Sequence, residues 1–93
     1  MFIKALFLQA KGNRRDRIAI ISDMLLCAVE GTKKTEIMYK VGLSTAQLNK
    51  YVPTLVRSEL LETLKQKNVT IYKTTAKGKS FLETFDTLIK LLD

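Results

Sequence analysis

The stretch that most constrains the fold is Gly31–Leu61, GTKKTEIMYKVGLSTAQLNKYVPTLVRSELL. Gly42 interrupts an apolar helical pattern and suits the left-handed residue that ends a helix. Shortly after it, Ser44-Thr-Ala-Gln47 has the S-x-x-Q spacing of a capping box, which starts the next helix. Two helices joined by three or four residues that include a glycine predict a helix-turn-helix.

The helix that begins after Ser44 has one apolar and one polar face. At about 100° per residue, one stripe is apolar (Leu48, Tyr51, Val52, Leu55) and the opposite side carries Ala46, Lys50, Pro53 and Arg57. The outer face has no acidic residue before Glu59, whereas a face selected only for solubility usually mixes charges of both signs. The pattern therefore favours an anionic partner.

Pro53 conflicts with a regular helix at this place. A proline inside a helix removes one backbone hydrogen bond and clashes with the carbonyl four residues earlier, here Asn49, at about 3 kcal/mol or more. We expect the helix either to kink at Pro53 or to end near Val52 and resume. The surface expected to contact the anionic partner is then the first two turns, Ser44 to Lys50.

Upstream, an amphipathic helix is predicted from Arg14 to Val29, ended by Glu30-Gly31. Its apolar stripe is Ile18, Ile21, Met24, Leu25, Ala28 and Val29, with Ile20 and Leu26 beside it. Thr32 is expected to be the N-cap of the following helix, whose Ile37, Met38 and Val41 point inward.

Downstream, Leu61–Lys65 and Val69–Thr74 read as the strands of a hairpin with Gln66-Lys67-Asn68 as its loop. A hairpin directly after the second helix of a helix-turn-helix is called a wing. Thr75 then caps a last helix, Ala76 to Leu92, with an apolar seam two heptads long. That seam packs either on the protein's own core or, as we favour, on a second copy; its residues are Phe81, Leu82, Phe85, Leu88, Ile89 and Leu92.

The N-terminal apolar segment, residues 1–13, is expected to be a strand or a helical turn. It has no small-x-small cleavage site and is far too short to span a membrane, so we expect a cytoplasmic protein. With 93 residues, one domain is expected, divided into residues 1–13, a helix-turn-helix with its wing at 14–74 and a C-terminal helix at 75–93.

Composition excludes several classes of function. The chain has no histidine, and its single cysteine, Cys27, lies in an apolar helical pattern, where we expect a buried side chain rather than an intermolecular disulfide. No catalytic constellation, metal site, cofactor or small-molecule substrate is therefore expected, and we predict that the protein is not an enzyme. The net charge of +7 favours nucleic acid or an anionic membrane surface as the partner.

Four segments resemble the small archaeal winged-helix DNA-binding proteins, a group that includes chromatin-type and regulator-like members, with similar domains in archaeal viruses and plasmids. These segments are Lys33-Lys-Thr-Glu-Ile-Met-Tyr-Lys40, Leu43-Ser44, Leu48-x-x-Tyr51 and Tyr72-Lys-Thr-Thr-x-Lys-Gly-x-x-Phe-Leu82. The resemblance implies a mainly α fold with a small β-hairpin (α+β), a winged helix-turn-helix whose C-terminal helices pair antiparallel in a homodimer. The final helix is shorter here than the rod of the chromatin-type members, and residues 1–13 have no counterpart in the pattern.

The function predicted from these features is double-stranded DNA binding, by a transcriptional regulator or a chromatin-type architectural protein. Positive charge is concentrated where contact is expected, because residues 33–79 hold ten Lys or Arg and three acids. Candidate phosphate ligands lie at the start of the second helix and on the wing, and candidate base readers lie on the third helix. The proposed DNA-contacting residues are Lys33, Lys34, Ser44, Thr45, Gln47, Asn49, Lys50, Lys65, Lys67 and Lys73. The alternative is a winged helix that uses the same face for an acidic protein partner.

Overall fold

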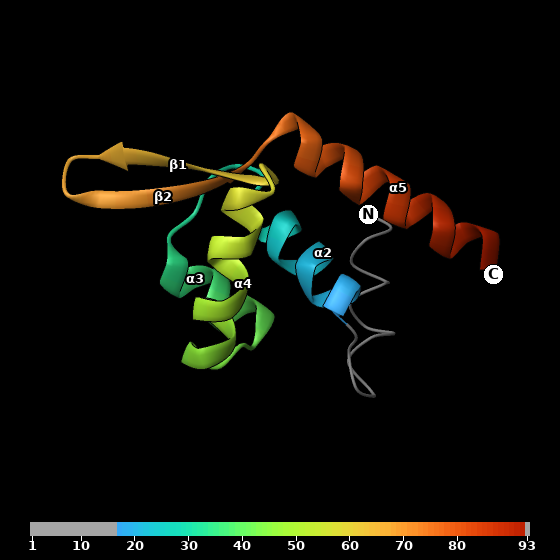
Figure 1. Ribbon diagram of the computed structural model, residues 1–93, viewed down its shortest axis with the longest axis horizontal. Helices are drawn as coiled ribbons and strands as arrows, with labels where there is room; N and C mark the ends of the chain where they lie inside the picture. The colour runs from blue at the N-terminus through green and yellow to red at the C-terminus, as the bar shows by residue number, and fades with distance from the viewer. Residues whose placement is uncertain (1–16, 93) are drawn as a thin grey trace.

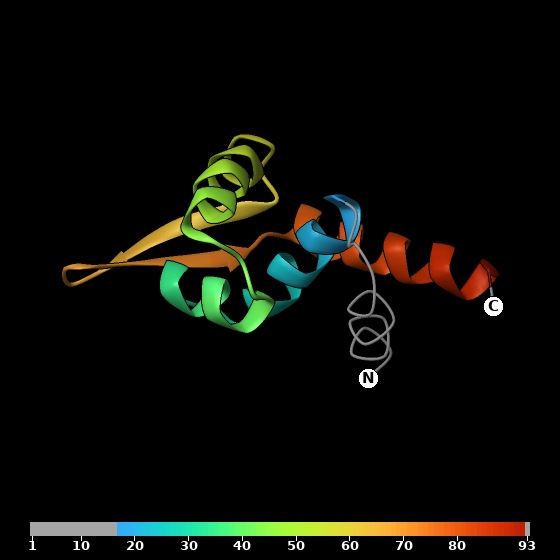
Figure 2. The same ribbon diagram turned by 90° about the horizontal axis from the view of Figure 1, so that it is seen from below.

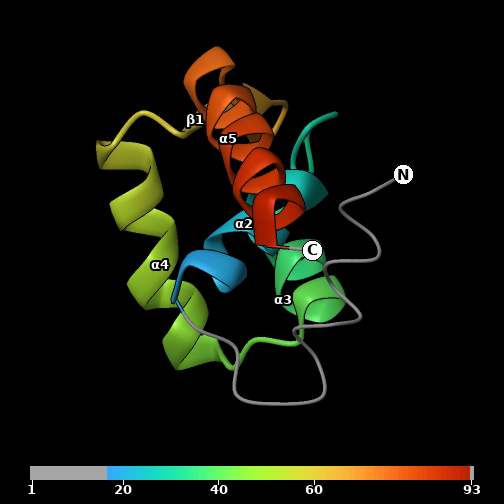
Figure 3. The same ribbon diagram turned by 90° about the vertical axis from the view of Figure 1, so that its right-hand side faces the viewer.

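The helical part of the fold is built around its first described helix. A computed structural model describes residues 17–92; the predictions for residues 1–16 lie outside this range. Helix α2 (Arg17–Cys27) lies between α4 (Thr45–Arg57) and α5 (Ala76–Leu92), and Figure 3 shows α3 (Lys34–Val41) on its other side. Buried residues lie almost all around α2, which explains why Ile20 is buried although it is off the predicted stripe.

The core consists of buried apolar side chains from the helices and from the first strand of the hairpin. Its most enclosed large members are Met24, Leu25, Ile37, Leu55 and Leu61. The predicted stripe of α4 is confirmed, because Leu48, Tyr51, Val52 and Leu55 are all buried. The buried faces of the amphipathic helices therefore meet one another around α2.

The first helix ends earlier than predicted, at Cys27 instead of Val29. The amide of Ala28 is shared between the carbonyls of Met24 and Leu25. Residues 28–30 then form a turn, which is closed by a hydrogen bond from Gly31 N–H to Ala28 O at 3.0 Å. The same carbonyl of Ala28 accepts from the amide of Thr74. The chain leaves the helix here because this carbonyl is bonded to the wing.

The predicted N-cap of α3 is also wrong by one residue. Lys33 occupies that position with extended backbone, and Thr32 instead pairs with Tyr72 of the hairpin. Gly42 at the other end has φ +80°, as the helix-ending role requires. The capping box at the start of α4 is confirmed: Gln47 N–H donates to Ser44 Oγ and Ser44 N–H donates to Gln47 Oε1.

Pro53 does not divide the helix. Helix α4 runs without a break from Thr45 to Arg57, so the expectation of an end near Val52 is wrong. Pro53 is on the exposed side, where its ring needs no space in the core, and the adjacent carbonyl of Lys50 accepts from Thr54 Oγ1 at 3.2 Å. The fold therefore tolerates the missing hydrogen bond to Asn49 without disturbing the buried stripe.

The hairpin consists of β1 (Leu61–Gln66) and β2 (Val69–Thr74), which pair antiparallel from Leu61–Thr74 to Gln66–Val69. Gln66 belongs to the strand, so the turn is only Lys67-Asn68, with Lys67 at φ +58°. Figures 1 and 2 show the tip of the hairpin projecting away from the helices, while its inner part lies beside them. At the base of the hairpin, Leu61 and Thr74 are buried.

Helix α5 begins at the predicted cap, since Thr75 Oγ1 accepts from Gly78 N–H at 3.0 Å. Its first turns pack on α2, and its C-terminal half extends beyond the other described helices (Figure 1). None of the helices between Arg17 and Leu92 is long and apolar enough to cross a lipid bilayer.

Candidate nucleic-acid interface

The outer face of α4 is the centre of the candidate interface. Ala46, Lys50, Pro53 and Arg57 are all exposed on the side opposite the buried stripe, as predicted. The Nζ of Lys50 lies 5.8 Å from the ring centroid of Tyr51, which holds the ammonium group near the helix surface. This face is therefore free of packing within residues 17–92 and carries two cations.

The start of α4 adds polar groups to this face. Ser44, Thr45, Gln47 and Asn49 are exposed. Gln47 is partly committed, because its Oε1 accepts from Ser44 N–H at 3.0 Å, which leaves the amide NH₂ group for an external acceptor. Asn49 has no such role among residues 17–92, so both its carbonyl oxygen and its NH₂ group can face a ligand.

The start of α3 lies beside the wing. Thr32 forms an isolated antiparallel bridge with Tyr72, so Lys33 follows directly on a residue that is paired with β2. Lys33 is exposed and Lys34 is half-buried. The structure thus brings the predicted phosphate ligands of α3 close to the predicted wing, which the sequence spacing of about forty residues did not indicate.

The wing carries its cations at different distances from the helices. Lys65 is exposed on β1, Lys67 is exposed in the turn at the free end, and Lys73 is half-buried near the base and opposite Glu62. The wing tip lies well away from α4 (Figures 1 and 2), so the predicted site is not a single cluster. It consists of a helix face and a separate arm, an arrangement that suits an extended ligand.

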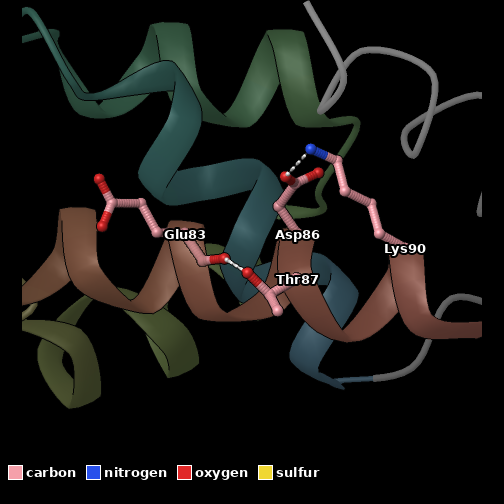
Figure 4. A network of polar contacts seen from close by, with 4 residues as sticks. All are labelled: Glu83, Asp86, Thr87 and Lys90. Atoms are coloured by element: carbon pink, nitrogen blue, oxygen red, sulfur yellow. Dashed lines mark hydrogen bonds and ion pairs between the residues drawn. The ribbon is translucent and has the colours of Figure 1, made fainter.

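Charge pairing leaves these cations available. Within residues 17–92 the described ion pair is Lys90 Nζ–Asp86 Oδ2, at 3.2 Å on α5, away from the interface. Figure 4 shows this pair on one side of the helix, with Thr87 Oγ1 donating to the carbonyl of Glu83 and the Glu83 carboxylate pointing away from Lys90. None of the ten predicted DNA-contacting residues takes part in it.

One basic residue was placed on this face by the sequence but was left out of the predicted DNA-contacting residues. Arg57 is exposed at the end of α4 on the same side as Lys50. The spacing of seven residues, two helical turns, is the signal that could have placed it in the site. Lys77, by contrast, has a structural contact, because its Nζ donates a hydrogen bond to Ser58 O, at the C-cap of α4, at 2.9 Å.

Two titratable groups in the described part of the chain have perturbed pKa values. A hydrogen bond from the Thr32 hydroxyl, and a second from the Lys33 amide, lower the pKa of Glu36. Burial raises the pKa of the Cys27 thiol, an effect that nearby Lys40 opposes. Glu36 lines an open hollow together with Tyr39 and Lys40. The described residues contain no group of three or more His, Cys, Asp or Glu side chains that could hold a metal ion.

Comparison with known proteins identifies the architecture. The model of a family described as winged helix-turn-helix matches residues 14–93. The chain belongs to the winged helix-turn-helix family. Within this family the predicted α+β fold is confirmed: α3 and α4 are the helix-turn-helix, and β1 and β2 are the wing.

Solved winged-helix structures are similar to this one. Sso10a-2, a DNA-binding protein from Sulfolobus solfataricus, has a TM-score of 0.72 and 27% identity, over 83% of this chain and 81% of that chain. NolR from Sinorhizobium fredii has a TM-score of 0.63 and 22% identity, over 96% and 83%. The MarR family transcriptional regulator SPO1453 from Silicibacter pomeroyi has a TM-score of 0.64 and 16% identity, over 96% and 65%. No curated protein sequence matches the chain.

Proposed function

We propose that this chain binds double-stranded DNA, with α4 in the major groove and the hairpin on the adjacent backbone. The observation that carries the proposal is the outer face of α4: a capped helix start followed by exposed polar and basic side chains that the described fold does not use for packing or ion pairs. The structural likeness to a DNA-binding protein of Sulfolobus and to a transcriptional regulator supports it.

Each part of the interface has a chemical role in this proposal. Asn49, Gln47 and Lys50 reach base edges, because amide side chains suit adenine and ammonium groups suit guanine. Ser44 and Thr45, with the free amides of the α4 N-terminus, hold a phosphate, and Arg57 holds another further along the groove. The remaining contacts are to phosphates, from Lys33, Lys34, Lys65, Lys67 and Lys73.

We further propose that two copies pair through α5. Leu88, Leu91 and Leu92 are 54%, 77% and 81% exposed. Next to them Ile18, Phe81 and Phe85 line a hollow of roughly 120 Å³, and the Phe81 and Phe85 ring centroids are 6.5 Å apart. Leu82 lies in the core of its own chain, so the contact would centre on Phe85, Leu88 and Leu92, with Ile89 at its edge.

The likeness to the Sulfolobus protein supports the further proposal that the chain is a small, cytoplasmic, non-enzymatic protein of the archaeal type, in which a dimer presents two helix-turn-helix units. Such a protein regulates transcription or packages DNA. A selected-oligonucleotide binding profile separates these roles, because a regulator enriches one sequence and an architectural protein enriches none.

The proposal is tested by duplex binding as a function of salt. If a dimer neutralises about eight phosphates, log K against log salt has a slope near −7. Lys50→Glu should weaken binding at least tenfold with an unchanged circular dichroism spectrum, because reversal adds repulsion at a groove contact. Lys90→Glu on α5 is the control, since it makes the same charge change away from α4 and the wing. Because it also removes the ion pair with Asp86 on the proposed dimer helix, sedimentation must first show that this variant keeps the oligomeric state of the parent.

Two outcomes contradict the proposal. The absence of duplex binding at low salt contradicts DNA binding itself, and equal weakening by the two charge reversals contradicts the placement of α4 in the groove. If the chain instead captures an acidic protein partner that excess DNA does not displace, the face serves protein recognition. The dimer is tested separately by sedimentation of Leu88→Glu, which should be monomeric where the parent is dimeric.

A further inference from the structure

Thr32 connects the helix-turn-helix to the wing. Its N–H donates to Tyr72 O at 2.9 Å, and Tyr72 N–H donates to Thr32 O at 2.8 Å, which is a complete two-way antiparallel pair. A single residue thus stands where a third strand would lie beside β2. Thr32 is buried, and the Tyr72 ring packs against the core.

The side chain of Thr32 extends this connection to α3. Its Oγ1 donates to Glu36 Oε1 at 2.6 Å, and the same carboxylate oxygen accepts from Lys33 N–H at 3.2 Å. Glu36 lies in the first turn of α3. One carboxylate oxygen therefore joins the start of the helix-turn-helix to the residue that holds the wing strand.

The hairpin has few other attachments. At its base Thr74 Oγ1 donates to Leu25 O at 2.5 Å, Thr74 N–H donates to Ala28 O at 2.9 Å, and Leu61 is buried. From Tyr72 to Lys67 the strand extends about 17 Å, at roughly 3.4 Å per residue. Ile71 still packs beside Gly31, whereas residues 62–69 are exposed, so a small rotation at Tyr72 moves the wing tip by several ångströms.

We propose that Glu36 is a positioning residue for DNA binding, which acts through Thr32 to hold the wing at the angle at which Lys65 and Lys67 reach the backbone while α4 occupies the groove. This inference rests on the proposed function. In this proposal, an acidic residue inside a basic interface strengthens the binding of an anion.

The sign of the effect separates positioning from simple electrostatics. Removing an acid near DNA strengthens binding if charge alone matters, because repulsion is removed. Glu36→Ala and Glu36→Gln both remove the charge, but only glutamine keeps an oxygen that accepts from Thr32 and Lys33. We expect Glu36→Ala to bind duplex DNA about fivefold or more weakly than Glu36→Gln, a difference that charge cannot produce.

A second readout uses the wing itself. In the parent chain and in Glu36→Gln, Lys67→Ala should reduce the salt slope by about 0.9 for each phosphate that is no longer neutralised. In Glu36→Ala the same substitution should change the slope by much less, because the wing tip no longer sits on the backbone. Thr32→Val, which removes the hydroxyl without changing charge or the backbone pair, should behave like Glu36→Ala.

Each result has a defined meaning when circular dichroism shows that all the variants are folded at the assay temperature. Equal affinities of the alanine and glutamine variants, or equal effects of Lys67→Ala in both, overturn the positioning role and leave DNA binding intact. A parent chain that fails to bind duplex overturns the proposed function instead. If Glu36→Ala does not fold, the comparison of Thr32→Val with the parent decides the question.

Discussion

The backbone of Gly78 in α5 lies directly against the carbonyl of Leu60. A methyl group placed on Gly78 would fall 2.4 Å from Leu60 O and 2.5 Å from Thr74 Cγ2. The helix can approach the base of the wing this closely only because residue 78 has no side chain. The same turn is held by Thr75 Oγ1, which donates to Glu59 O, and by Thr75 N–H, which donates to Leu60 O.

Gly78→Ala should therefore destabilise the fold although alanine favours helices. Backbone atoms must move to admit the methyl group, at a cost of about 1–3 kcal/mol. Urea unfolding followed by circular dichroism measures the change. Ser80→Ala, an exposed substitution in the same turn region, should stay within about 0.5 kcal/mol; equal effects of the two would mean that the contact with Leu60 relaxes freely.

Pro53→Ala should stabilise the chain. The exposed proline leaves the carbonyl of Asn49 without its helical donor, and an alanine restores that N–H with no change in the core. The expected gain is up to about 3 kcal/mol, reduced by the greater freedom of the unfolded alanine chain. A thermal unfolding midpoint that falls would show that the proline sets a helix shape that the buried stripe requires.

Arg57→Ala tests the residue that sequence reasoning omitted. If α4 lies along the major groove over its full length, this substitution should lower the salt slope by about 0.9 and weaken binding similarly for all sequences. Asn49→Ala should instead reduce the preference for particular bases and leave the slope unchanged. An unchanged slope for Arg57→Ala would confine the DNA contact to the first turns of α4.

The pH dependence of stability should include a contribution from Glu36. Its pKa is lowered in the folded state, so its hydrogen bonds contribute stability above the unfolded pKa, and this contribution disappears as the pH falls through the folded pKa. Urea midpoints measured between about pH 6 and pH 3 should decline more steeply for the parent chain than for Glu36→Gln, which cannot titrate. Parallel curves would mean that the pKa of Glu36 is the same in the folded and the unfolded chain.

Features set by neighbouring residues could be predicted from the sequence. The Ser44–Gln47 capping box, the left-handed Gly42 and the Thr75 cap all form within a few residues, and the buried stripe of α4 follows from helical periodicity. The hairpin, and with it the order of the elements, also followed from residue patterns, and the family resemblance agreed with them. The exposed face of α4 followed as the complement of its buried stripe.

Features set by distant contacts could not be predicted. Thr32 looked like a helix cap because nothing in its local sequence reveals Tyr72, forty residues later. Helix α2 ends early because Ala28 O is bonded to Thr74, and Leu82 enters the core because α5 leans on α2. The angle between α4 and the wing, which decides whether the candidate residues form one surface, is likewise a tertiary property.

The two-stranded wing affects whether copies of this protein aggregate at high concentration. Within residues 17–92, β1 pairs only with β2, so the outer backbone edge of β1 has hydrogen-bonding groups without a strand partner. An open edge of this kind is a template on which another chain can add a strand and begin to aggregate. Glu62, Lys65 and Lys67 place charge along that edge and at its end, and lysine is the residue that most effectively discourages such pairing. The basic wing therefore also protects the protein from its own copies.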